Sequence, residues 1–502
     1  MSNQSTQREI SKSVAQNMSV MFGAQVVTWG SSFLLLYFLP RYLGPEDFGR
    51  LYLALSIKMM LGLIIDFGGN YLIPKEVARS KVKGERILSS YIMFRSVLWV
   101  LAIGLILLFS NLLGYSQHVH LLILILVIAK LWEGGTTALN SYFEGIEKME
   151  YPSIGKIVEK VFVAVFAVGA LLLGADSIGV AIIMTVGALL NLIVIYGYSR
   201  KVVRIRYKFD PEMFSLFRAG MPFFLFSLFS VIYYRIDAVM LASFTSEEVT
   251  GWYGGAFRFF DIVMVLPLIY KTAIFPVFSK LWDNTKGVLE SAVGQSMRLM
   301  ILLGIPVAAL IYIFAEPIIH FFMGINEYGP SVIILQIFAL SIPIIYIDII
   351  LGSALMGAAN RQKAWAVVGL IAIFINISVN YLLIPYTQQV FLNGGIGAAV
   401  ATLITEIFVM VSAFYLLPRD YLKTFRSSYI VKPFAATILM VLPVILLLSY
   451  TGLYWMIILF LASVFYISSL FLLKTFDKAE LKMITAFISE SRQNLLTHFK
   501  KS

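Results

Sequence analysis

The chain has 502 residues, of which 59% are hydrophobic and only 13% are charged. Soluble proteins carry about 25% charged residues, so this composition excludes an ordinary soluble protein and indicates an integral membrane protein. The absence of cysteine excludes disulfide and thiol chemistry, four histidines disfavour a metal site, and the net charge of +11 would suit nucleic acid or anionic lipid.

Fourteen apolar segments are long enough to cross a bilayer, which takes about 20 mostly apolar residues. A polar segment, 1–16, precedes them without a cleavage-site pattern after the first apolar run, which is therefore interpreted as a retained helix and not as a signal peptide. The sequence predicts helices at 17–39, 50–73, 88–112, 120–145, 154–173, 178–199, 215–244, 252–279, 295–319, 331–356, 364–385, 395–417, 430–450 and 453–473.

The charges of the connecting loops alternate along the chain. Lysine and arginine gather in the even-numbered connections, such as 75–86 and 200–208, whereas the odd-numbered ones carry only Arg41 and Arg50. By the positive-inside rule, both termini are expected to be cytoplasmic. Positive charge spread over the loops of one face is an orientation signal, which argues against nucleic acid as a partner. The tail, 474–502, has apolar residues at helical spacing and is expected to be a cytoplasmic amphipathic segment.

Three patterns of the first half recur in the second half. FGRLYLALS at 48–56 resembles TGWYGGAFR at 250–258, EGIEKM at 144–149 resembles MGAANRQK at 356–363, and IGVA at 178–181 resembles IGAA at 396–399. Each match is separated by close to six helices, which predicts a parallel repeat about an axis along the membrane normal. The expected fold is all-α, with two pseudo-symmetric six-helix lobes around a central cavity. These are an N-lobe at 17–199 and a C-lobe at 215–417, joined by a basic linker at 200–214, and helices 13 and 14 at 418–473 are an addition.

Several charged residues fall inside the expected helices, where each costs about 2.5–3.5 kcal/mol near the centre of the bilayer. Lys58, Arg235 and Arg258 lie roughly 9–15 Å below the outer ends of their helices at the helical rise. Cations that converge at one depth in a cleft suit a phosphate or diphosphate, since arginine can bind phosphate oxygens bidentately. These three residues are the predicted cationic binding site.

The acidic residues of the expected helices have two interpretations, which the sequence leaves open. They are charge partners of the cations, or they are proton or Na⁺ sites that couple transport; the residues are Asp66, Asp237, Asp261 and Asp348. Arg258 and Asp261, three residues apart, could also simply neutralise each other. No catalytic residue, metal ligand or other cofactor is predicted.

Polar and aromatic residues inside the helices would suit sugar hydroxyls, and they would suit hydrogen bonds between helices equally well. The candidate sugar contacts are Gln25, Trp29, Asn70, Tyr233 and Tyr234. For Asn140, Asn376 and Asn380, hydrogen bonds between helices are the favoured interpretation.

Two stretches carry a resemblance to a known family. YLGPEDFGRLYLALSIKMMLGLIIDFGGNYLIPKEVARS at 42–80 has Phe48-Gly49 after a short outer turn and Asp66-Phe67-Gly68 before a basic loop. NISVNYLLIPYTQQVFLNGGIGAAVATLITE at 376–406 has an Asn-rich helix, a Leu-Ile-Pro exit and a Gly-containing loop. With these features the chain resembles, over essentially its whole length, the Wzx-type polysaccharide flippases of the MOP superfamily.

The resemblance implies two six-helix lobes and an alternating-access cycle. It implies a substrate made of an oligosaccharide on an undecaprenyl-type lipid diphosphate, moved from the inner to the outer leaflet of the cytoplasmic membrane. The family's cationic cavity would correspond to Lys58, Arg235 and Arg258. No bond is made or broken in such a cycle, so no enzyme activity is expected. The expected partners are the lipid-linked glycan, membrane lipids and the glycan polymerase and assembly machinery.

Two other functions are alternatives to a flippase. A cation-coupled multidrug exporter of the MATE type usually has twelve helices and an acidic cavity, so the extra helix pair and the converging cations argue against it. A membrane glycan polymerase or ligase needs a catalytic outer surface. The outer loops here are short, and His118, His120 and His320 have no group of carboxylates beside them.

Overall fold

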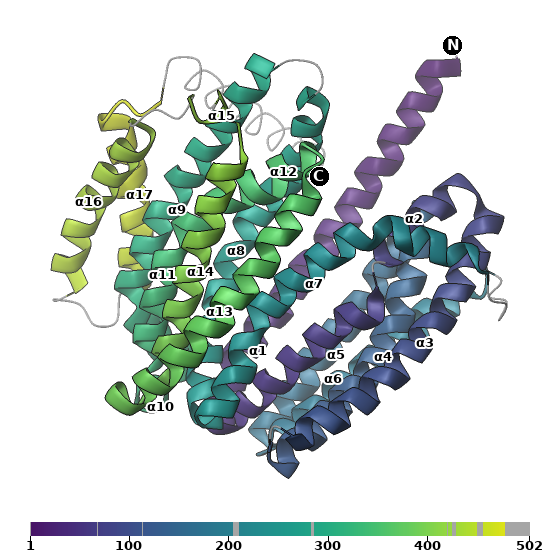
Figure 1. Ribbon diagram of the computed structural model, residues 1–502, viewed down its shortest axis with the longest axis horizontal. Coiled ribbons are helices and arrows are strands. Elements are labelled where there is room, and N and C mark those ends of the chain that lie inside the picture. The colour runs from purple at the N-terminus through teal and green to yellow at the C-terminus, as the bar shows by residue number, and fades with distance from the viewer. Residues whose placement is uncertain are drawn as a thin grey trace, which may run out of the picture. The chain divides into compact units, whose positions relative to one another are not determined.

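The computed structural model describes residues 2–67, 69–112, 114–203, 210–282, 286–418, 420–423, 428–448 and 455–476. Within these ranges every regular element is a helix (Figure 1). The helices are α1 (Ser2–Asp66), α2 (Gly69–Arg79), α3 (Lys81–Leu112), α4 (Gln117–Gly145), α5 (Glu150–Leu172), α6 (Ser177–Ser199), α7 (Glu212–Phe244), α8 (Glu247–Trp282), α9 (Lys286–Met323), α10 (Ile325–Tyr328), α11 (Ser331–Asp348), a π-helix (Ile349–Leu355), α12 (Met356–Ala358), α13 (Gln362–Phe391), α14 (Gly394–Leu416), α15 (Asp420–Lys423), α16 (Ser428–Leu448) and α17 (Trp455–Leu472).

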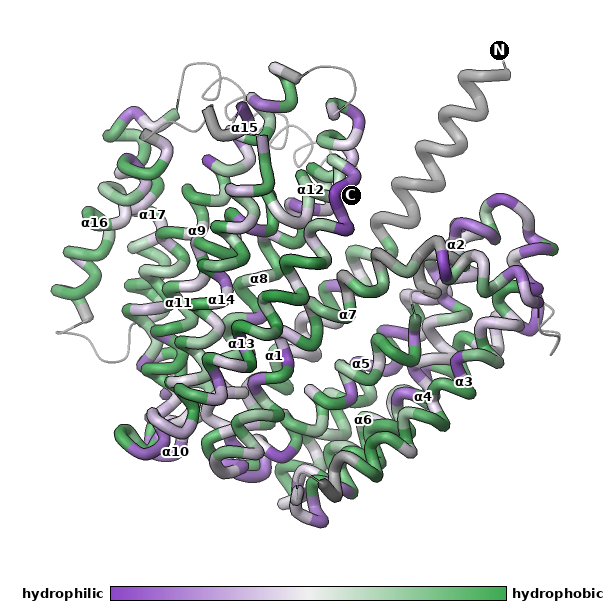
Figure 2. The backbone as a smooth tube through the Cα atoms, in the orientation of Figure 1, coloured by the Kyte–Doolittle hydropathy of each residue, from purple (hydrophilic) through white to green (hydrophobic). Residues whose placement is uncertain are grey.

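In the described part of the chain, the fourteen expected apolar segments lie almost entirely in these helices, which confirms an all-α membrane architecture; residues 68, 449–450 and 453–454 of these segments lie outside the described residues. Hydrophobic residues cover most of the length of the helices, and hydrophilic residues gather at many of their ends and turns (Figure 2). Among the described residues, 11 helical stretches are long and apolar enough to cross a membrane. One of them, Val20–Asp66, has 47 residues and covers most of two expected crossings, 17–39 and 50–73. The total of fourteen crossings stays a prediction.

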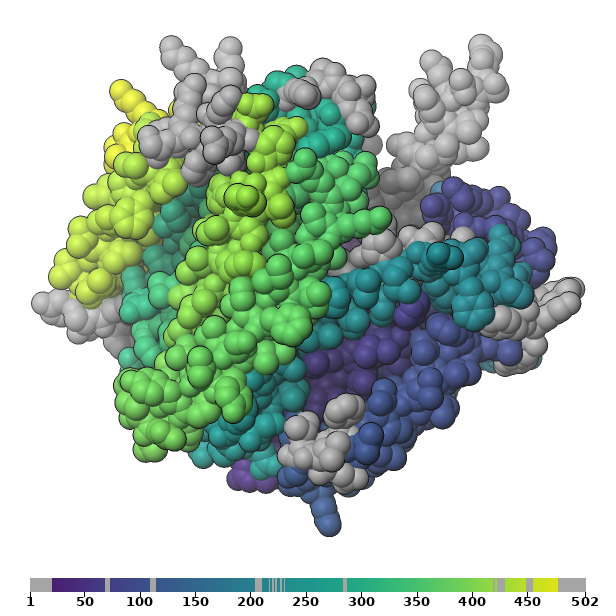
Figure 3. All heavy atoms as spheres, in the orientation of Figure 1, coloured from purple at the N-terminus to yellow at the C-terminus, as the bar shows by residue number. Residues whose placement is uncertain are grey.

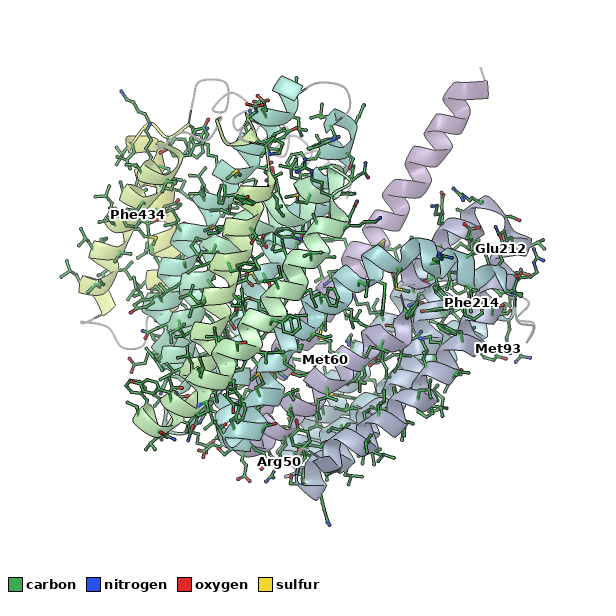
Figure 4. The ribbon with its side chains drawn as sticks, in the orientation of Figure 1. Arg50, Met60, Met93, Glu212, Phe214 and Phe434 are labelled. Carbon is green, nitrogen blue, oxygen red and sulfur yellow. The ribbon has the colours of Figure 1, made fainter. Side chains whose placement is uncertain are left out.

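Helix α1 consists of two helices that meet at a kink. Gly44 has a φ of 69° and a ψ of 170°, and Pro40 and Pro45 flank it. Proline cannot donate its backbone hydrogen bond, and the positive φ is accessible to glycine without steric cost. The kink therefore separates the first two expected helices. The second half of α1 carries Arg50 near one end and Met60 further along it (Figure 4).

The second expected helix, 50–73, ends earlier than the apolar run that defines it. Phe67 has a φ of 39°, in the left-handed region. An α-helix cannot continue through this conformation. Helix α1 accordingly ends at Asp66, and the residues from Gly69 onward form the separate helix α2.

The chain divides into two compact units. The first unit comprises Met1–Ile262, Ile318–Phe338 and Asn360–Val409, and the second comprises Val263–Pro317, Ala339–Ala359 and Met410–Ser502. In the first unit, α1 packs against α4, α5 and α7, while α13 packs along α7. In the second unit, α16 and α17 lie side by side (Figure 1). The expected division at the linker 200–214 stays a prediction.

Within the first unit, α1 and α8 cross at two glycines. A Cβ atom on Gly49 would lie 1.8 Å from the backbone oxygen of Glu247, and one on Gly251 would lie 1.9 Å from the backbone oxygen of Pro45. Only glycine permits such a close approach of two backbones. These glycines hold matching places in the segments 48–56 and 250–258, so two copies of the sequence repeat pack directly against each other.

Candidate functional site

A cavity in the first unit collects the three predicted cations. Its volume is about 480 Å³, within the range of about 300–1,000 Å³ for small-molecule sites. Lys58 of α1, Arg235 of α7 and Arg258 of α8 line it. In the space-filling view, side chains of α1 form the floor of a recess between α7 and α3 (Figure 3). The structure thus brings together residues that are up to 200 positions apart in the sequence. We call the space that Lys58, Arg235 and Arg258 line the cationic cavity.

The α1 side of the cationic cavity carries a network of ion pairs. Lys58 pairs with Glu133 of α4. Lys130 Nζ lies 3.1 Å from Asp66 Oδ2 and 3.8 Å from Glu133 Oε2. Arg95 of α3 pairs with Asp66 from behind the cavity and also donates to the Gly134 carbonyl. Asp66 is therefore a charge partner, as one of the two interpretations proposed, and its partners come from α3 and α4.

Arg235 is held between a carboxylate and aromatic rings. Its guanidinium donates to Asp261 Oδ2 at 3.1 Å and to the Tyr52 hydroxyl at 3.5 Å, and it lies 5.0 Å from the centroid of the Phe257 ring. The closer pairing along the sequence, Arg258 with Asp261, does not form an ion pair within the described part of the chain. The reason is that Asp261 is oriented toward the arginine of α7.

Arg258 is the cation of this cavity with the greatest capacity for a new anion. Its guanidinium lies 4.8 Å from the centroid of the Phe48 ring, a cation–π contact that leaves the charge intact. Within the described ranges, no carboxylate oxygen lies within 4.0 Å of the Arg258 guanidinium, the distance that defines an ion pair. The lining has one more cation than anion, since it contains Lys58, Lys130, Arg235 and Arg258 against Asp66, Glu133 and Asp261.

Asp237 does not line the cationic cavity but is buried in a group of neutral hydrogen-bond donors. The Tyr253 hydroxyl donates to it at 2.7 Å, the Thr402 hydroxyl at 2.9 Å, and the Asn380 amide at 2.6 Å. Asn380 also donates to Asn376 Oδ1 at 2.9 Å. Burying a charge is costly unless hydrogen bonds compensate it. Asn380 thus makes the polar contact between helices expected for it, from α13 to α7, whereas its bond to Asn376 lies within α13.

Three further predicted residues lie away from the cationic cavity. Tyr233 is buried and its hydroxyl donates to Glu406 of α14 at 2.8 Å, so it already has a protein partner. The ring of Tyr234 lies 5.0 Å from that of Tyr233 and does not line the cavity. Asp348 belongs to the second unit, where it is buried at the end of α11 beside the π-helix.

The remaining candidate sugar contacts separate from one another. Trp29 is on α1 with 47% of its surface exposed. The side chain of Asn70 lies outside the described residues. Gln25 lines a second cavity of the first unit, with a volume of about 460 Å³, which shares Lys130 and Glu133 with the lining of the cationic cavity and therefore lies next to it.

The second cavity was missed by the sequence analysis, although α4 carries a signal for it. Glu133, Thr137, Asn140 and Glu144 recur at intervals of three and four residues, which places them on one helical face, and all four line this cavity. A polar stripe on an otherwise apolar membrane helix must face protein or water. Which other helices complete the cavity depends on packing.

Comparison with known proteins shows which family the chain resembles. The polysaccharide biosynthesis protein family matches residues 14–282, more than half of the chain, and the MatE family matches residues 222–382. A probable low-salt glycan biosynthesis flippase, Agl15 of Haloferax volcanii, is 23% identical over 394 residues, covering 78% of this chain and 80% of the relative. The succinoglycan biosynthesis transport protein ExoT of Rhizobium meliloti is 23% identical over 336 residues, covering 66% of each.

Solved structures of transporters share the fold. The lipid II flippase MurJ, in an inward closed conformation, superposes with a TM-score of 0.71 at 17% identity, covering 91% of this chain and 98% of MurJ. A multidrug resistance MATE family transporter of the MOP superfamily gives a TM-score of 0.65 at 15% identity, covering 77% of this chain and 93% of that transporter. This multi-pass membrane chain therefore belongs to the polysaccharide biosynthesis protein family and has the fold of the MOP superfamily.

Proposed function

We propose that the chain is a flippase that moves a lipid-diphosphate-linked oligosaccharide from the inner to the outer leaflet of the cytoplasmic membrane by alternating access. The observation that carries the proposal is the cationic cavity, where cations of α1, α7 and α8 meet inside an apolar membrane chain. The family membership and the names of the two relatives, a glycan biosynthesis flippase and a succinoglycan transport protein, support it.

The ion pairs of the cavity supply a way to bind and release a diphosphate. In the structure, Glu133 pairs with Lys58 and Asp261 pairs with Arg235, so that neither cation is left alone in a low-dielectric site. Arg258 provides the first attraction for the diphosphate, and the two paired cations then exchange their carboxylates for phosphate oxygens. The one excess cation of the lining offsets half of the two negative charges of the diphosphate, which lowers the cost of moving this group across the bilayer.

The rest of the cycle follows from this binding mode. The lipid tail stays in the bilayer, and the glycan accompanies the diphosphate. The positive charges of the loops favour a cytoplasmic position for both termini. No bond is made or broken. A proton or Na⁺ gradient drives the cycle, with Asp237 as the coupling residue, because its buried carboxylate can take up a proton, and the hydroxyl oxygens of Tyr253 and Thr402 beside it are ligands that suit Na⁺. The delivered glycan would pass to polymerase and assembly machinery.

The test is transport by the purified chain in vesicles, measured as the fraction of a labelled lipid-linked glycan that becomes accessible from the opposite leaflet. We expect Arg258→Glu and Arg235→Glu each to lower the rate at least about tenfold, because each removes a charged hydrogen bond and adds repulsion. Arg218→Glu is the matched control, since Arg218 is an exposed residue of α7 outside the cavity. Full activity of both cavity variants, with normal insertion, would overturn the cationic site.

The match of residues 222–382 to the MatE family favours one second candidate, a cation-coupled multidrug exporter. Its cationic drugs would meet a cavity that already carries excess positive charge. The same vesicles distinguish the two functions: export of a cationic dye without movement of lipid-linked glycan would favour the exporter.

A further inference from the structure

The second cavity lies directly beside the cationic cavity. It is formed by residues of α1, α4, α5 and α6 in the first unit, and Lys130 and Glu133 line both spaces. A group bonded covalently to a diphosphate must occupy the space next to it. In a lipid-linked glycan that group is either the lipid or the first sugar, and the second cavity is lined mostly by polar side chains.

The charges of the second cavity balance. Three lysines face three glutamates, whereas the cationic cavity has an excess of one cation. A balanced lining gives no net attraction for an anion or a cation, so a neutral polar group suits it best. The residues are Lys130, Lys156 and Lys160, and Glu133, Glu144 and Glu159.

Two of these charges are accessible for hydrogen bonds to a ligand. Glu144 and Lys156 are exposed, and within the described part of the chain neither has an opposite charge within ion-pair distance. Lys156 Nζ donates to Gln25 Oε1 at 3.2 Å and retains further donors. A carboxylate that accepts from hydroxyls and an ammonium that donates to them complement the alternating donors and acceptors of a sugar ring.

We propose that the second cavity is a sugar subsite that takes the neutral hexose or N-acetylhexosamine attached directly to the diphosphate. This proposal rests on the proposed function and deepens it, because it assigns the part of the substrate that follows the diphosphate. Lys130 and Glu133 lie at the junction, so the lining that meets the diphosphate also meets the first sugar. Glu144 and Lys156 form hydrogen bonds with the sugar hydroxyls on the side of the cavity away from Lys130 and Glu133.

The experiment measures binding to the full chain in lipid nanodiscs. The probes are a polyprenyl diphosphate without sugar and the same lipid carrying glucose, galactose or N-acetylglucosamine. We expect wild type to bind at least one sugar-bearing probe about tenfold more tightly than the sugar-free one, as charged hydrogen bonds to hydroxyls allow. Glu144→Gln and Lys156→Gln should reduce this preference severalfold and leave binding of the sugar-free lipid unchanged.

Matched controls come from the same end of the helices. Glu150→Gln and Lys201→Gln remove the same charges outside the cavity and should keep the wild-type preference. No preference of wild type for any sugar, or a preference unchanged in both cavity variants, overturns the subsite while the diphosphate site stands. If wild type binds neither the sugar-free nor the sugar-bearing lipids, the proposed function fails and the subsite fails with it.

Discussion

Arg235 and Lys58 show what a single sequence can and cannot say about a buried charge. Both were singled out because a charge in an apolar helix is costly. Their partners were not identified, since Lys58–Glu133 and Arg235–Asp261 join positions 75 and 26 residues apart. Local spacing indicated a pair of Arg258 with Asp261, which forms no ion pair among the described residues, whereas Lys130 and Glu133, also three residues apart on one helical face, do form one.

Asp237 is a predicted residue that lies outside the cationic cavity, and its proposed role in ion coupling can be tested. Asp237→Asn keeps the shape of the side chain and an acceptor for the hydroxyls of Tyr253 and Thr402. If Asp237 carries the coupling ion, the variant should bind the lipid-linked glycan normally but lose the acceleration that a proton or Na⁺ gradient gives to transport in vesicles.

The control for this measurement is Glu248→Gln, because Glu248 is an exposed carboxylate in the first turn of α8. This variant should respond to the gradient like wild type. Gradient-driven acceleration that persists in Asp237→Asn would remove Asp237 from the coupling mechanism.

Helices were predictable as apolar runs, but their interruptions were predictable only where the sequence contains a strong signal. The kink of α1 coincides with Pro40, Gly44 and Pro45, and the first helix was expected to end at 39. The break at Phe67 lies inside an apolar run, where hydropathy gives no sign of it. The π-helix Ile349–Leu355 is likewise hidden, since its sequence, IILGSAL, consists of apolar and small residues that show no face of the helix.

The crossing of α1 and α8 gives a prediction at this scale. Gly49→Ala and Gly251→Ala would each place a methyl group less than 2 Å from a backbone oxygen, which no side-chain rotation relieves. We expect each variant to force the helices apart and to lower the thermal midpoint of the purified chain, by an amount corresponding to about 1–3 kcal/mol of overpacking.

Gly30→Ala is the matched control on α1, since a Cβ there would meet nothing within 4 Å. Alanine favours the helix by about 1 kcal/mol over glycine, so this variant should be neutral or slightly stabilising. The same midpoint for Gly49→Ala and Gly30→Ala would contradict the tight crossing.

For the whole molecule, composition alone identified a membrane protein, and the resemblance of 42–80 and 376–406 identified a family that the comparisons confirm. The meeting of Lys58, Arg235 and Arg258 was anticipated from their similar depth and from the repeat. The second cavity was not, because α4 shows its polar face in the sequence but the faces of α1, α5 and α6 that complete it are set by packing.

The central claim is that the cationic cavity binds a lipid diphosphate through Arg258. The most direct measurement compares the affinities of the chain in nanodiscs for a polyprenyl diphosphate and for the uncharged polyprenyl alcohol of the same length. We predict that wild type prefers the diphosphate at least about tenfold and that Arg258→Glu binds the two lipids about equally. Equal affinities in wild type, or a preference that Arg258→Glu retains in full, would contradict the account.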